Sequence, residues 1–197
     1  IPALIEMAHW LAGHITPQAR RMAAVVAQGH LPDQWATEKM RNPASRPTIG
    51  VVSHGALVGL PFGQIEAQAL LDHLAKGVQG LRLTPWRALV LEDGKMPSSG
   101  PFITDPNDPL IRVDACVGAP LCASGNAETR RLARQLAPLT RGSLHVSGCT
   151  KGCARAQTAD VVLIAQDGTF SLVKDGCASD TPVQTGLSPT DLLTGEI

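Results

Sequence analysis

Two cysteine pairs constrain the fold of this chain more than any other feature of its sequence. The first pair lies in "ACVGAPLCAS", residues 115–124, and the second in "SGCTKGCARA", residues 147–156. Each pair directly follows a strand-like run, "LIRVDA" in the first case and "SLHVSG" in the second. If these strands are parallel neighbours in one sheet, both loops leave the same edge and the four thiols converge on one point.

Soft thiolate ligands suit zinc, copper(I) or an iron–sulfur cluster. Structural zinc sites usually separate the two ligands of a pair by about two to four residues. The second pair has three residues between its cysteines and fits that range, whereas the first pair has five. An iron–sulfur cluster is larger and tolerates longer spacings, so the pattern favours a cluster. Zinc is the alternative, and four inert core cysteines are the weaker interpretation.

The residues around the cysteines favour the same interpretation. Gly118, Gly148 and Gly152 allow backbone N–H groups to turn toward sulfur. Hydrogen bonds to sulfur tune the reduction potential of a cluster. Lys151 and Arg155 are expected to offset the negative charge of the thiolates and of inorganic sulfide.

The composition argues against several other classes of function. Of the 197 residues, 44% are hydrophobic and 3% aromatic, and 17 basic residues balance 17 acidic ones. The balance gives no support to a generalised nucleic-acid or membrane surface, and the scarcity of aromatic rings argues against base stacking. No apolar run approaches the roughly 18 residues of a membrane span, and the opening "IPALIEMAHW" does not resemble a signal peptide.

We therefore expect a cytoplasmic, reducing location for this chain. The odd number of five cysteines argues against a disulfide scaffold, which is typical of short secreted domains. Cys177 stands alone in "KDGCASD" and is assigned no role.

Three segments are predicted along the chain. Residues 1–45 are expected to form a helical linker or accessory segment that ends in a polar, proline-rich stretch. Residues 46–95 alternate short β-type runs with a helix, and residues 96–197 contain both cysteine pairs. In the last segment an amphipathic helix is predicted over 126–138 and a hairpin at Asp167–Gly168. Strands interleaved with helices indicate the α+β class, of the α/β sandwich type.

The two cysteine motifs, in the order "ACVGAPLCA" and "VSGCTKGCARA", resemble the cluster-binding signature of the nitrite and sulfite reductase superfamily. The earlier block "GALVGLPFGQIEAQALLDHLAKGVQGLRLTPWRALVL" is similar to the ferredoxin-like half-domain of that superfamily, so the resemblance covers roughly residues 48–175. It implies a ferredoxin-like half-domain at 46–95 and, at 96–197, a domain of mixed sheet and helices that holds a four-iron four-sulfur cluster beside a tetrapyrrole. The implied cluster ligands are Cys116, Cys122, Cys149 and Cys153.

Two details resemble the precorrin-3B synthase family in particular, "RLTPWR" at 82–87 and "HVSGCTKGCA" at 145–154. Assimilatory reductases more often have asparagine where this chain has Lys151. The resemblance implies an O2-dependent monooxygenase that hydroxylates precorrin-3A in aerobic cobalamin biosynthesis. It further implies a mononuclear non-haem iron besides the cluster, and a separate electron donor.

The resemblance also implies which residues bind the substrate, namely Arg82, Thr84, Arg87, Lys151 and Arg155. A tetrapyrrole of this kind is a polyanion, and arginine offers a planar, bidentate and permanently charged partner for carboxylates. Without the family, solvated arginines at a strand edge are the simpler interpretation. The catalytic residue is unknown. His54, His73 and His145 are available to the non-haem iron, but no ligand set is assigned.

The superfamily is built as a duplication within one long chain, and this sequence contains one copy. It therefore resembles the C-terminal half of a larger protein, which binds a cluster and needs the N-terminal half or a partner chain to turn over. The alternative enzyme is a sirohaem-dependent sulfite or nitrite reductase, in which Cys153 takes the position that bridges the cluster and the haem iron. An alternative of another class is a non-catalytic zinc or cluster module.

Overall fold

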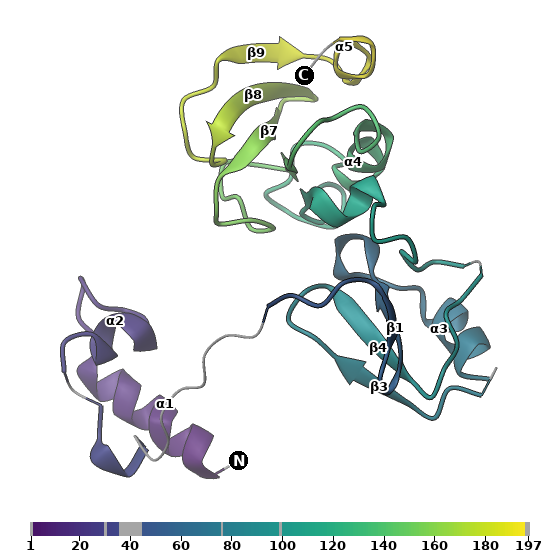
Figure 1. The fold of residues 1–197 in the computed structure, drawn as a ribbon. Helices are drawn as coiled ribbons and strands as arrows, with labels where there is room; N and C mark the ends of the chain where they lie inside the picture. Colours follow the sequence, from purple (N-terminus) through teal and green to yellow (C-terminus); the bar gives the residue numbers. More distant parts are fainter. Residues whose placement is uncertain (1, 30, 36–44, 76, 99, 196–197) are drawn as a thin grey trace. The chain divides into compact units, whose positions relative to one another are not determined.

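The computed structural model describes residues 2–29, 31–35, 45–75, 77–98 and 100–195. They fall into two compact units, Ile1–Ser45 and Arg46–Ile197 (Figure 1). Among the described helices, none combines the length and the apolar character that a membrane crossing requires. The predicted division of the chain into residues 1–45, 46–95 and 96–197 stays a prediction.

The first unit is helical. It contains α1 (Pro2–His14), α2 (Met22–Val26) and the short 3₁₀ helix η1 (Asp33–Trp35). Trp10 stacks on His14 with ring centroids 4.4 Å apart and meets Trp35 edge-on at 5.6 Å. The contact between Trp10 and Trp35 connects α1 to η1, while Val25 of α2 is fully buried.

The second unit begins with a four-stranded antiparallel sheet in the order β1-β2-β4-β3. Its strands are β1 (Gly50–Val52), β2 (Gly55–Gly59), β3 (Gly80–Leu83) and β4 (Ala88–Glu92). The helix α3 (Ala67–Leu74) follows the 3₁₀ turn η2 (Pro61–Gly63). Alternate residues of the central strands, including Val58 and Leu91, pack with Leu70 of α3 in one hydrophobic core. Strands β3 and β4 pair with each other, and the turn that joins them contains Pro85, which cannot donate a hydrogen bond within a ladder.

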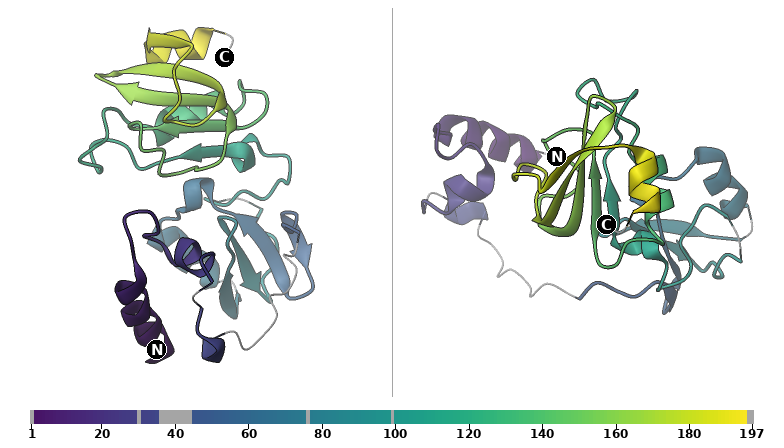
Figure 2. Two further views of the ribbon diagram at one scale, coloured as in Figure 1. Left: turned by 90° about the vertical axis from the view of Figure 1, so that its left-hand side faces the viewer. Right: turned by 90° about the horizontal axis from the view of Figure 1, so that it is seen from above.

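The second sheet has five strands in the order β5-β6-β7-β8-β9. Its strands are β5 (Val113–Ala115), β6 (Leu144–Ser147), β7 (Ala159–Gln166), β8 (Thr169–Gly176) and β9 (Gln184–Leu187). Strands β5, β6 and β7 are parallel, whereas β7, β8 and β9 pair antiparallel. Figure 2 shows this sheet from two further sides. The strands that precede the two cysteine pairs are therefore parallel neighbours, which is the arrangement that lets the thiols converge.

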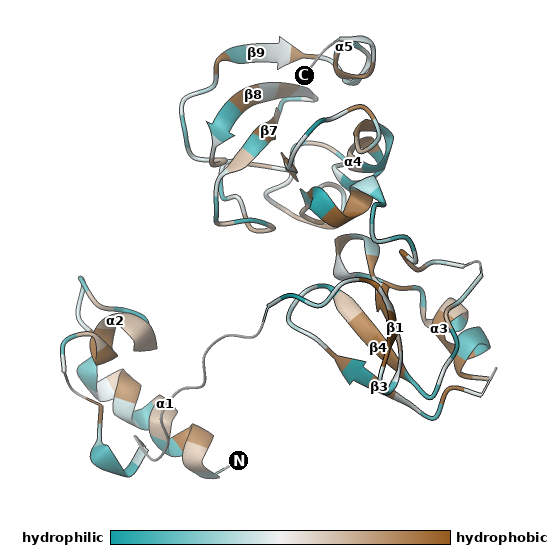
Figure 3. Ribbon diagram, viewed as in Figure 1, coloured by the Kyte–Doolittle hydropathy of each residue, from teal (hydrophilic) through white to brown (hydrophobic). Residues whose placement is uncertain are grey.

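The helices of the second sheet lie over one face of it. They are α4 (Arg130–Leu136) and α5 (Pro189–Thr194), and the 3₁₀ helix η3 (Pro109–Arg112) precedes β5. Leu136 of α4 and Leu192 of α5 are buried in one core with Leu144, Val146 and other alternate strand residues. Hydrophobic and hydrophilic positions alternate along α4, as expected for a helix with one buried face (Figure 3). The fold is α+β, as predicted.

The two sheets of the second unit share contacts. Phe62 of η2 belongs to the core of the second sheet, although η2 follows a strand of the first. Its backbone has a positive φ of 56°, which is uncommon for a bulky residue. Gly59 at the end of β2 forms an isolated bridge with Ile103, which leads toward the second sheet. Phe62 therefore connects the turn after β2 to the core of the second sheet.

Candidate metal centre

The four predicted cysteines line one cavity of about 400 Å³. Cys116 immediately follows β5, and Cys149 lies two residues beyond β6. Because β5 and β6 are parallel, their loops leave the same edge of the sheet. All five cysteines are free thiols, and Cys153 is the exposed member of the four that line the cavity. Their role as cluster ligands stays a prediction.

Hydrogen bonds position the first cysteine loop against the second. The N–H of Gly148 donates to Cys116 Sγ at 3.1 Å, and the N–H of Asn126 donates to the carbonyl of Gly148 at 2.9 Å. Lys151 Nζ donates to Ser124 Oγ at 2.9 Å, which links the two loops a third time. The cradle for the sulfur atoms is thus formed by both loops together.

The carbonyl groups of the cysteines are also bound. Thr129 Oγ1 donates to the carbonyl of Cys116 at 2.6 Å. Ser147 Oγ donates to the carbonyl of Cys149 at 2.7 Å. These two hydrogen bonds hold the backbone of Cys116 and of Cys149 in one orientation.

Glycine is required at Gly118 of the cradle, and a side chain at Gly148 would fit only tightly. Gly118 has a φ of +63°, and a Cβ there would lie 2.6 Å from the carbonyl oxygen of Ala127. A Cβ at Gly148 would lie 3.4 Å from Cys116 Sγ and 3.2 Å from Gly118 Cα. The absence of side chains leaves space beside the sulfur and lets the backbone N–H approach it.

The donor set fits an iron–sulfur cluster. Four thiols around one cavity, with a backbone N–H directed at sulfur, are the ligands and the hydrogen bond that such a cluster uses. Within the described residues, no group of three or more His, Cys, Asp or Glu side chains is arranged to hold a metal ion.

Two of the predicted substrate residues line the cavity, Arg87 and Lys151. Arg87 Nη2 forms an ion pair with Asp114 Oδ1 at 3.1 Å, and its Nη1 donates to the carbonyl of Val113 at 2.8 Å. Burial lowers the pKa of the Arg87 guanidinium, and the Asp114 carboxylate opposes this effect. Arg87 therefore links the first sheet to β5 at the edge of the cavity.

Arg155 lies on the other side of Asp114. Its Nη1 binds Asp114 Oδ2 at 3.0 Å, and its Nε and Nη2 donate to the carbonyl of Thr158. Arg155 is not among the residues that line the cavity. It fixes the end of the second cysteine loop to β5.

The structure does not bring Arg82 and Thr84 to the cavity. Arg82 Nη2 pairs with Glu92 Oε1 at 2.6 Å, and its side chain is 63% exposed. Thr84 Oγ1 donates to the carbonyl of Ala88 at 2.8 Å and so stabilises the turn between β3 and β4. The role of these two residues in substrate binding stays a prediction.

The sequence prediction did not include several residues that line the cavity, among them Asp114, Phe62 and Arg130. Asp114 alternates with buried Val113 and Ala115 in β5, so the period of the strand could have identified it. Phe62 and Arg130 reach the cavity through tertiary packing, and no local pattern marks them.

His145 is fully buried on β6, opposite Asp114 in the parallel register. Its two ring nitrogens have no hydrogen-bond partner within the described residues. Burial lowers the pKa of this imidazole; Asp114 raises it in part, and Arg155 lowers it further. The imidazole is therefore held in its neutral form.

The fold of this chain is that of the nitrite and sulfite reductases. It matches the structure of the NirA protein of Mycobacterium tuberculosis with a TM-score of 0.50 and 17% sequence identity, over 82% of this chain and 39% of that one. No family model matches the sequence.

In sequence, the chain is similar to precorrin-3B synthase of Sinorhizobium sp, with 30% identity over 207 aligned residues. The match covers 92% of this chain and 45% of the relative, so the chain spans less than half the length of that protein.

Proposed function

We propose that this chain is the C-terminal, cluster-binding half of a precorrin-3B synthase. In this proposal the complete enzyme is an O2-dependent monooxygenase that hydroxylates precorrin-3A in aerobic cobalamin biosynthesis. The similarity to precorrin-3B synthase over 92% of the chain supports the choice of family. The single observation that supports the chemistry is the convergence of four cysteines, from loops after two parallel strands, on one cavity.

In this proposal both cysteine loops would supply ligands to a four-iron four-sulfur cluster, Cys116 and Cys122 from the first loop and Cys149 and Cys153 from the second. The N–H of Gly148 stabilises the thiolate of Cys116. When bound, the cluster supplies single electrons to the substrate site.

The cations of the cavity attract the substrate. Arg87 and Lys151 line the same cavity as the thiols, and precorrin-3A is a polycarboxylate. Lys151 is held by the neutral hydroxyl of Ser124, so its charge is not neutralised by that contact. Lys151 therefore favours an anionic ligand beside the cluster, whereas the charge of Arg87 is partly compensated by Asp114.

The proposal needs components that this chain does not supply alone. The mononuclear non-haem iron has no ligand set assigned here, and the electron donor and the N-terminal half are separate partners. A cytoplasmic location belongs to the proposal, because free thiols and a cluster require a reducing compartment.

The activity is tested by anaerobic reconstitution of the chain together with the N-terminal half, followed by addition of precorrin-3A, a reductant and 18O-labelled O2. Hydroxylation adds one labelled oxygen atom to the substrate, while the other oxygen atom leaves as water with two electrons and two protons. We expect labelled product by mass spectrometry only when both halves are present. Reduction of sulfite or nitrite, with sirohaem bands in the visible spectrum, would instead identify the alternative reductase.

A further inference from the structure

We infer that Arg130 is a ligand-binding residue that recognises a carboxylate group of the tetrapyrrole. The inference rests on the proposed function and extends it to a residue that neither the sequence motifs nor the comparisons assign. Arg130 is the first residue of α4 and lines the cavity that the four cysteines share.

The bonding of Arg130 differs from that of the other arginines near the cavity. Arg87 and Arg155 both form ion pairs with Asp114. Arg130 has no carboxylate partner within the described residues, and its Nη1 donates to the neutral amide oxygen of Gln64. Its charge is therefore not compensated by any carboxylate in the part of the chain that the structure describes.

One donor of Arg130 is buried without an acceptor. Its Nε has no hydrogen-bond partner among the described residues, although it is inaccessible to water. A buried N–H without a partner is costly, so a ligand that supplies an acceptor recovers this cost. A carboxylate is a stronger acceptor for guanidinium than an amide oxygen, because the bond is charge-assisted and bidentate. We therefore expect Arg130 to exchange Gln64 for a ligand carboxylate.

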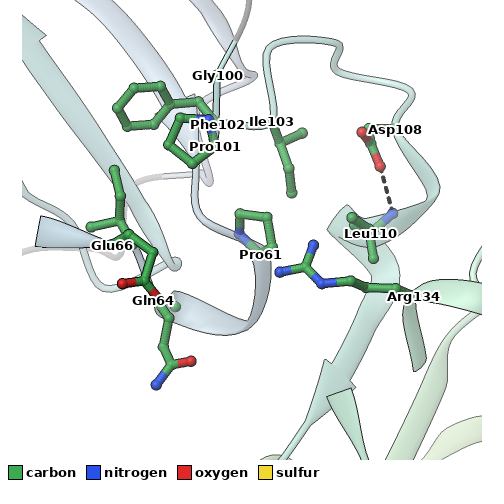
Figure 4. A pocket seen from close by; sticks show the side chains of 12 residues that line it. Pro61, Gln64, Glu66, Gly100, Pro101, Phe102, Ile103, Asp108, Leu110 and Arg134 are labelled. Carbon is green, nitrogen blue, oxygen red and sulfur yellow. Dashed lines mark hydrogen bonds between the residues drawn. The ribbon is translucent and has the colours of Figure 1, made fainter. Parts of the chain in front are cut away.

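The same helix offers a matched control. Arg134 lies one turn after Arg130, and its guanidinium carbon is 5.0 Å from the centre of the Phe62 ring. It lines a separate cavity of about 670 Å³ together with Pro61 and Gln64. Figure 4 shows the Arg134 side chain extended beside Pro61 in that cavity. Arg134 thus has the same charge on the same helix without lining the cavity of the thiols.

The test uses the 197-residue chain with its cluster reconstituted anaerobically. Uroporphyrin, a tetrapyrrole polycarboxylate, is titrated into the wild type, Arg130→Gln and Arg134→Gln, and its methyl ester serves as an uncharged probe. We expect Arg130→Gln to raise the Kd of the acid about 10-fold or more and to leave the Kd of the ester unchanged. Arg134→Gln is expected to bind both probes like the wild type.

Equal affinity of the wild type and Arg130→Gln for the acid would overturn the role of Arg130 and leave the proposed function standing. An equal loss for acid and ester would also overturn it, because it would indicate a structural effect. If Arg130→Gln does not fold, Arg130→Lys is titrated in its place. This variant retains the charge without the planar fork, so an unchanged Kd for the acid again refutes the inference. Failure of the wild-type chain to bind the acid would also overturn the inference, whereas the proposed function is decided separately by turnover of precorrin-3A with both halves present.

Discussion

Cys149 and Cys177 are both free, partly exposed thiols, but only Cys149 lines the cavity. Cys177 instead directs its Sγ at the carbonyl of Ala156, 3.6 Å away. We predict that Cys149→Ser loses the cluster, because an alcohol is a poor replacement for a soft thiolate ligand. Cys177→Ser is expected to retain it. Iron and acid-labile sulfide, measured after anaerobic reconstitution, distinguish the two variants, and equal loss in both would refute the ligand assignment.

His145 makes the stability of the fold depend on pH. Its pKa in the folded chain is below the ordinary value of about 6.5, chiefly because of burial. Between the folded pKa and the ordinary value, the imidazole of the unfolded chain binds a proton and that of the folded chain does not. A fall in pH through this range therefore favours unfolding. We predict that the stability contributed by the neutral imidazole is present above pH of about 6.5 and is lost as the pH falls toward the folded pKa.

Urea unfolding at several pH values measures this effect. His145→Leu is expected to flatten the dependence of the free energy of unfolding on pH between about 7 and 5. The exposed His54 supplies a matched control, and His54→Leu is expected to keep the dependence. The same slope in His145→Leu and the wild type would show that another group titrates.

At the scale of structural elements, Asp114 connects three parts of the second unit. It lies on β5, pairs with Arg87 next to β4 and pairs with Arg155 at the end of the second cysteine loop. Its side chain is only 13% exposed, so both ion pairs are largely shielded from water. The carboxylate therefore holds the first sheet and a cysteine loop against the same strand.

We predict that Asp114→Asn lowers the free energy of unfolding by about 3 kcal/mol, because it leaves two partly buried guanidinium groups without their counter-charge. Glu92→Gln breaks the exposed pair with Arg82 and is expected to cost below about 1 kcal/mol. Chemical denaturation of both variants measures the difference. A cost for Asp114→Asn as small as that for Glu92→Gln would contradict the proposed bridge.

The sequence predicts the elements around the cysteines better than the complete site. Strand-like runs before each pair correctly indicate β5 and β6, because the alternation of apolar residues is local. The motif "RLTPWR" suggests that Arg82 and Arg87 act together, but the turn between β3 and β4 separates them. Arg87 has a φ of 53° there and turns toward Asp114, whereas Arg82 stays on the exposed strand. Such a separation depends on backbone conformation, which the motif does not encode.

Arg130 and Phe62 illustrate what the sequence leaves out. Arg130 belongs to a helix whose amphipathic pattern explains its buried leucines and says nothing of Gln64, which lies 66 positions earlier. Phe62 enters the core of the second sheet from a turn after the first sheet. Both contacts arise from the packing of distant segments, so they become visible only in the folded chain.

At the scale of the whole molecule, the chain spans 45% of the length of its precorrin-3B synthase relative. The four cysteines nevertheless all lie in this chain and line one cavity of its second unit. Cluster binding is therefore expected of the 197-residue chain by itself, whereas turnover is expected to require the other half. Cluster binding can therefore be measured on this chain independently of turnover.

The central claim is that this cavity holds an iron–sulfur cluster, and its most direct test is metal and sulfide analysis of the chain purified without oxygen. We predict about four iron atoms and about four acid-labile sulfides per chain, with broad visible absorption that dithionite bleaches. Zinc in place of iron, with no acid-labile sulfide, would contradict the account and would identify the chain as a zinc-binding module.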